Sequence, residues 1–269
     1  MKKTIGLCSV LLLSAVAIST EASANTGGEY ESNGGVQFIP NNNITSPVNP
    51  IDPDPGEPVK PIDPVNPEGP NPGTNGPLSI DYASSFDFGI NRISNRDETY
   101  YARAQFYHSD VEDAEELITP NYVQVTDNRG TNAGWTLTVK QNGQFYSEEA
   151  DYGTLDGSQI TLTDSFVNSN AAAQVARPET FSQITLDPNG AISTVMAAKD
   201  KSGAGTWVNG WGEVETITEK NEDNDDVEAH VTKAVSLSVP GSTPKEAVVY
   251  RTTLNWNLTD APLNGTDNN

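Results

Sequence analysis

Short runs in which apolar and polar residues alternate succeed one another along the chain from residue 100 onward. They cover residues 100–107, 122–126, 135–140, 159–163, 181–186, 192–197, 232–239 and 248–258. Successive side chains of a strand point to opposite faces, so a period of two separates the apolar side chains from the polar ones. The pattern predicts many short β-strands, each with one face against a core.

Turn sequences rich in Asn, Asp and Gly separate these runs. They stand at residues 127–130, 141–143, 156–157 and 187–190. The last of them, Asp-Pro-Asn-Gly, favours a type I turn and predicts a hairpin over residues 181–197. Many short antiparallel strands with such turns are typical of a sandwich or a barrel. We therefore expect an all-β chain with a single β-sandwich-like domain over residues 77–262 and a polar tail at 263–269.

Residues 25–76 show almost no core-forming pattern. Proline recurs at nearly every third position between residues 47 and 72, which is the repeat of a polyproline II helix. The spacing predicts a disordered N-terminal segment in which residues 47–72 form an extended spacer; a motif for a proline-recognising partner is the alternative. Residues 34–40, Gly-Gly-Val-Gln-Phe-Ile-Pro, can pair with an exposed sheet edge, although disorder is the preferred interpretation.

The first 24 residues have the composition of a secretory signal peptide. Lys2 and Lys3 precede an apolar stretch at residues 5–17, and Ala-Ser-Ala ends at Ala24, where cleavage is expected. Cys8 is the only cysteine and leaves with the signal, so the secreted chain has no disulfide and no cysteine-based metal site. No other stretch is apolar enough to span a membrane. A secreted protein without a visible covalent or lipid anchor is the expectation.

Acidic residues outnumber basic ones, and the formal net charge is −22. Such a charge repels nucleic acid and anionic membrane surfaces, which excludes both as partners through general electrostatics. Binding to a wall rich in anionic polymers must then come from local contacts. The acidic segment at residues 219–228 lacks the spacing of a calcium-binding loop, and we interpret it as a solvated loop.

Motifs for catalysis and cofactor binding are absent from the sequence. His108 and His230 are the two histidines, and neither stands in a metal-binding or catalytic motif. Paired carboxylates for glycoside hydrolysis depend on spacing in three dimensions, and nothing in the sequence singles out a pair. We expect no enzyme activity, no cofactor and no metal site.

Four tryptophans are the candidate binding residues. Trp135 with Leu137, and Trp256 with Leu258, form two Trp-x-Leu tripeptides, each with both apolar side chains on one face of one strand. These faces either pack into the core or form aromatic platforms for a sugar polymer, and the flanking apolar residues favour the core. Trp207 and Trp211 stand four residues apart among glycines, and they are the candidates for stacking on glycan.

The two Trp-x-Leu tripeptides, the signal peptide, the Pro/Asp-rich segment and the β-rich domain together resemble a WxL-domain cell-surface protein of low-GC Gram-positive bacteria. Further matching segments are residues 78–88, 134–139, 205–207, 211–212, 239–241 and 250–258. The resemblance implies non-covalent attachment to peptidoglycan. It also implies that the WxL residues are Trp135, Leu137, Trp256 and Leu258.

The same resemblance implies partners besides the wall. These are other WxL proteins and a membrane-anchored companion, assembled into surface complexes with roles in adhesion to host matrix proteins or in the use of plant polysaccharides. The alternative function is therefore that of a complex subunit which binds a partner surface protein or a host matrix protein, with indirect wall contact.

Overall fold

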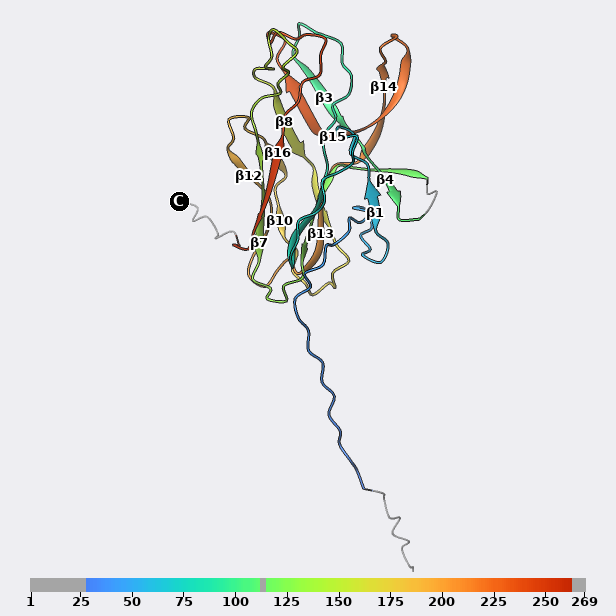
Figure 1. Ribbon diagram of the computed structural model, residues 1–269, viewed down its shortest axis with the longest axis vertical. Coiled ribbons are helices and arrows are strands. Elements are labelled where there is room, and N and C mark those ends of the chain that lie inside the picture. Colours follow the sequence, from blue (N-terminus) through green and yellow to red (C-terminus); the bar gives the residue numbers. More distant parts are fainter. Residues whose placement is uncertain (1–27, 112–114, 263–269) are drawn as a thin grey trace, which may run out of the picture. The chain divides into compact units, whose positions relative to one another are not determined.

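The computed structural model describes residues 28–111 and 115–262 (Figure 1). The expected signal peptide and the polar tail at 263–269 lie outside these residues. The strands are β1 (Val59–Pro61), β2 (Leu78–Ala83), β3 (Glu98–Arg103), β4 (Gln105–Ser109), β5 (Glu116–Thr119), β6 (Tyr122–Asp127), β7 (Trp135–Gln141), β8 (Gln159–Thr163), β9 (Ser165–Asn168), β10 (Glu179–Thr180), β11 (Gln183–Thr185), β12 (Ile192–Ala198), β13 (Gly205–Trp211), β14 (Val214–Lys220), β15 (Asp226–Val239) and β16 (Leu254–Thr259).

Four sheets arise from these strands. Their orders are β2-β6-β13-β9, β10-β12-β7-β16, β11-β8-β15-β14 with β3 also paired to β15, and β1-β4-β5. One cluster of buried apolar side chains draws on β6, β7, β8, β12, β13 and β15, so the first three sheets share a core. No helix occurs among the described residues, and the all-β sandwich-like class is confirmed.

The predicted hairpin over residues 181–197 is wrong, although its turn is present. The N–H of Gly190 donates to the carbonyl oxygen of Asp187 at 2.9 Å. The strand before the turn, β11, pairs with β8, whereas the strand after it, β12, pairs with β7 in another sheet. The turn therefore carries the chain from one sheet to another. Both flanking strands still bury apolar side chains in the same core, which lies between the sheets.

The proline-rich segment packs on the domain, so the expected disordered spacer is also corrected. Val48 is buried in a small cluster with Tyr82, Tyr122 and Val208, and its N–H donates to Oε1 of Gln124 at 2.8 Å. Further along the segment, β1 pairs with β4. We call residues 46–72 the strap, because Val48 packs across Tyr82 of β2, Tyr122 of β6 and Val208 of β13. Residues 28–43 lie outside any strand and are exposed.

A buried carboxylate lies beneath this strap. Oδ1 of Asp81 accepts a hydrogen bond from Ser79 Oγ at 2.6 Å. Its Oδ2 accepts from Gln124 Nε2 at 2.9 Å and from Thr126 Oγ1 at 2.6 Å. The same Gln124 amide donates to the carbonyl oxygen of Ser46 in the strap. Burial raises the pKa of Asp81 from 3.8 to about 6, although its hydrogen bonds act in the opposite direction.

Stability is expected to depend on the ionisation of Asp81. The pKa of Asp81 is higher in the folded state than in the unfolded state. The stabilising contribution of its protonated carboxyl group is therefore fully present below pH 3.8 and is lost as the pH rises through about 6. In Asp81→Asn, the amide nitrogen can face Ser79 and the amide oxygen can accept from Thr126, without a buried charge. The free energy of unfolding of the variant, relative to that of wild type, should therefore be higher at about pH 7 than at about pH 4, by up to roughly 3 kcal/mol. Urea unfolding at both pH values measures this gain, and an equal difference at both would contradict it.

Candidate functional site

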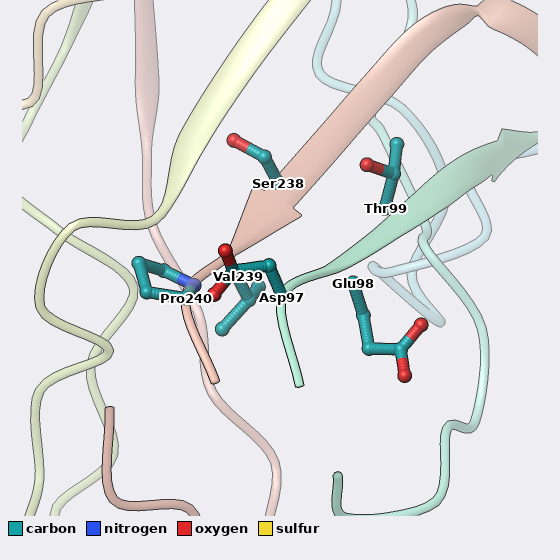
Figure 2. A pocket seen from close by; sticks show the side chains of 6 residues that line it. All are labelled: Asp97, Glu98, Thr99, Ser238, Val239 and Pro240. Atoms are coloured by element: carbon teal, nitrogen blue, oxygen red, sulfur yellow. The ribbon is translucent and has the colours of Figure 1, made fainter. Parts of the chain in front are cut away.

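Two of the hollows on the described surface are candidate sites. The first, of about 280 Å³, lies where β3 begins and β15 ends; it is lined by Asp97, Glu98, Thr99, Ser238, Val239 and Pro240 (Figure 2). Asp97 is part of the framework there, since its Oδ1 accepts from the N–H of Gly241 at 2.8 Å. The second, of about 510 Å³, is lined by Asp164, Phe166, Gly212, Glu213, Glu215, Lys233 and Ala234. On its rim, Lys233 is paired with Glu215 at 2.6 Å.

The two Trp-x-Leu tripeptides come together on neighbouring strands. β7 and β16 are antiparallel, with Leu258 opposite Leu137 and Trp256 opposite Val139. Residues directly opposite one another point to the same face of a sheet, so both tripeptides direct their side chains toward the core. The sequence showed two separate motifs, and the structure combines them into one apolar surface.

Trp135 and Leu137 are completely buried. The indole N–H of Trp135 donates to the carbonyl oxygen of Gly203 at 2.9 Å, which satisfies its one polar group. Trp256 and Leu258 are half-buried and pack against the same core from the edge strand. The ring centroids of Trp256 and Trp211 are 6.3 Å apart. The four WxL residues therefore lie where the core interpretation places them.

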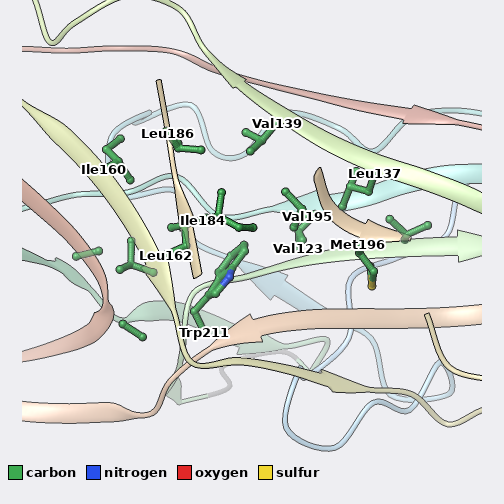
Figure 3. Close-up of a cluster of buried hydrophobic side chains, with 14 of the residues drawn as sticks. Val123, Leu137, Val139, Ile160, Leu162, Ile184, Leu186, Val195, Met196 and Trp211 are labelled. Atoms are coloured by element: carbon green, nitrogen blue, oxygen red, sulfur yellow. The ribbon is translucent and has the colours of Figure 1, made fainter. Parts of the chain in front are cut away.

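Trp207 and Trp211 do not fit the stacking role expected for them, because their exposed fractions are only 3% and 1%. Figure 3 shows Trp211 among the aliphatic side chains of the core, and its ring meets Phe86 edge to face with centroids 6.2 Å apart. Trp207 and Trp211 lie on the same face of β13, and that face packs against the shared core. The neighbouring Gly210 leaves room for the ring of Phe166 rather than for a ligand.

Two exposed tyrosines on the segment between β7 and β8 present their aromatic rings to a ligand. Tyr146 and Tyr152 have exposed fractions of 52% and 64%. Two backbone hydrogen bonds of 2.8 and 2.9 Å join Tyr146 to Arg251. The N–H of Tyr152 donates to Oε1 of Glu246 at 2.8 Å. Sequence reasoning missed these residues because an exposed tyrosine in a loop has no periodic pattern.

The acidic segment at residues 219–228 forms the end of the β14–β15 hairpin. Lys220 pairs with Asp226 at 2.7 Å, and Glu219 accepts from the guanidinium of Arg103. Across residues 28–111 and 115–262, no group of three or more His, Cys, Asp or Glu is placed to hold a metal ion. Within the same ranges, no helix has the length and apolar character needed to cross a membrane.

Comparison with known proteins gives one match. A family model described as a WxL domain, surface cell wall-binding, matches residues 25–262, and so includes the strap as well as the sheets. No curated protein matches the chain, and no solved structure does.

Proposed function

The chain belongs to the family of WxL domains that bind the cell wall at the surface, and from this premise we propose that it is a secreted protein held on peptidoglycan by non-covalent contacts. Wall binding is the family's described property, and the description names no reaction. The signal-peptide sequence at residues 1–24 supports export. Because the family match begins at residue 25, the strap is part of the binding unit that we propose.

The exposed pair Tyr146 and Tyr152 is the observation that carries a site for this function. A tyrosine ring offers an apolar face to the C–H side of a pyranose and a hydroxyl to its rim. Both residues are attached to a backbone that is hydrogen-bonded to the segment at 246–251, so little ordering is needed when a glycan binds. Short-range contacts of this kind suit a protein whose net charge of −22 gains nothing from an anionic wall.

Replacing both tyrosines with alanine should weaken binding to isolated sacculi without unfolding the protein. Stacking contacts contribute roughly 0.5–1.5 kcal/mol each, so the double variant Tyr146→Ala/Tyr152→Ala should bind about 5- to 160-fold more weakly. Sedimentation of residues 25–269 with sacculi, with and without their teichoic acids, measures the bound fraction. A thermal melt of each variant shows whether the fold is retained.

Phe181→Ala is the matched control, since this exposed aromatic residue lies between β10 and β11. The proposal requires that Phe181→Ala bind like wild type. If wild type does not sediment with sacculi, direct wall binding is rejected. If the double variant binds as tightly as wild type, the tyrosine site is rejected.

The second candidate is a subunit of a surface complex, which reaches the wall through another protein. The exposed apolar residues Val36 and Phe38 near the N-terminus favour a protein contact of some kind. The partners of this alternative are other WxL proteins, a membrane-anchored companion or a host matrix protein. Sedimentation that depends on an added partner would support it over direct binding.

A further inference from the structure

We propose that the N-terminal arm, residues 28–39, adds as a strand to the free edge of β16 in a second copy of this chain. The proposal is independent of glycan binding and rests on two features of the structure. One is a sheet edge without the usual protection against pairing. The other is an exposed segment with the pattern of a strand.

The acceptor is the outer edge of β16, which ends the sheet β10-β12-β7-β16. The N–H of Asn142 donates to the carbonyl oxygen of Thr253 at 2.9 Å, so these opposite residues form a hydrogen-bonded pair. Such pairs alternate along antiparallel strands, and the backbone groups of Leu254, Trp256 and Leu258 therefore point away from β7. Within residues 28–111 and 115–262, these outward groups have no hydrogen-bond partner.

The edge of β16 also lacks the devices that keep other edges unpaired. Its sequence, Leu-Asn-Trp-Asn-Leu-Thr, contains no charge and no proline, and its register with β7 is unbroken. By contrast, β14 carries Glu215 and Glu219 on its edge, and β2 is covered where the N–H of Thr74 donates to Ile80 at 2.8 Å. The half-buried side chains of β16 would lose their remaining exposure to water if another strand were added.

The donor is the run Val36-Gln37-Phe38 within the arm. Val36 and Phe38 have exposed fractions of 79% and 88%. In an extended segment they share one face, with Gln37 on the other. Their face would continue the apolar face of Trp256 and Leu258, while Gln37 would join the polar face of Asn255 and Asn257. An exposed apolar segment of this kind is stabilised by a sheet that accepts it.

A second copy suits this contact better than the same chain. Just after the arm, the N–H of Asn41 donates to the carbonyl oxygen of Asn128 at 3.3 Å. The next residue, Arg129, donates to Gly134 at the start of β7, which is the end of the sheet where β16 finishes. An arm folding back from this point along its own β16 would be parallel to it. An arm from another copy is free to pair antiparallel, as the strand pairs of this fold do.

Each copy then contributes one donor and one acceptor, which are different surfaces. Two copies can exchange their arms reciprocally in a two-fold dimer, or the contacts can continue from copy to copy into rings or chains. We expect the average mass of residues 25–269 to rise with protein concentration in light scattering and in analytical ultracentrifugation, without any wall material present.

Variants in the arm test the donor without touching the folded domain. Val36→Pro/Phe38→Pro removes two N–H donors and two apolar side chains, and the protein should become monomeric at concentrations where wild type associates. Glu31→Pro/Asn33→Pro is the matched control, with the same spacing in the same exposed arm, and should associate like wild type. A monomeric wild type, or association that survives Val36→Pro/Phe38→Pro, overturns the proposal.

A cross-link tests the acceptor. The chain after residue 24 contains no cysteine, so Gln37→Cys in one preparation and Asn257→Cys in another report only on contact between copies. Mixing them under mild oxidation should give a disulfide that joins the two substituted positions, identified by mass spectrometry. A mixture of Gln37→Cys with Glu222→Cys, in the β14–β15 turn, is the control. Equal yields in the two mixtures would reject β16 as the acceptor. If only a strand of another protein binds the edge of β16, a second copy of this chain is rejected as the occupant.

Discussion

Replacing Trp135 by alanine is expected to lower the free energy of unfolding by about 3–5 kcal/mol. The side chain is completely buried in the shared core, and its indole N–H donates to Gly203 at 2.9 Å. Removing it leaves a cavity and also an acceptor without its donor. Urea unfolding of residues 25–269 measures the loss.

Two comparisons separate the causes of this loss. Trp135→Phe keeps most of the ring and removes the hydrogen bond, and it should cost less than the alanine variant. Trp256→Ala should also cost less, because the half-buried Trp256 lies on an edge strand where the site can relax. If Trp135→Ala unfolds at the same urea concentration as wild type but fails to bind sacculi, Trp135 would be a ligand contact and the structural role would be wrong.

Gly134→Ala is expected to cost about 2–5 kcal/mol, the second large effect. Gly134 has φ +75°, a conformation that costs other residues about 1–2 kcal/mol. A Cβ atom at this position would also lie against the carbonyl oxygen of Ala198 and 2.6 Å from that of Lys199. These are backbone atoms of the last residue of β12, which pairs with β7, and of the residue after it. They can move only if the end of the sheet distorts, which adds roughly a further 1–3 kcal/mol.

Gly130→Ala is a matched control for this prediction. Gly130 has φ +73°, and a Cβ atom there would meet nothing within 4 Å. The control should therefore show the backbone cost alone, about 1–2 kcal/mol. Equal losses for the two variants, measured by urea unfolding, would show that crowding by the sheet contributes nothing at Gly134.

These predictions assign the WxL motif a structural role within a binding domain. Trp135, Leu137, Trp256 and Leu258 join two neighbouring strands to one core, which explains why the pattern identifies the family although its side chains face inward. Their arrangement also leaves the backbone of Trp256 and Leu258 at the outer edge of the sheet. The motif can thus serve assembly through its main chain while its side chains stabilise the fold.

The sequence by itself determined the all-β class, several of the strands, many of the turns and the family to which the chain belongs. These properties are local: the alternation around Trp135, the turn at 187–190 and the Trp-x-Leu spacing are visible within a few residues. The sequence also favoured a buried position for Trp135, because its apolar neighbours Leu137 and Val139 lie on the same face of the strand, and the side chain is indeed buried.

Only the tertiary structure decided which sheet each strand joins and which aromatic rings remain exposed. β11 and β12 flank one turn yet pair in different sheets, and the strap at Val48 packs against strands distant in sequence. Trp211 is buried and Tyr152 exposed for the same reason: burial depends on partners from remote parts of the chain. A local pattern predicts the face on which a side chain lies, but it carries no information about what covers that face.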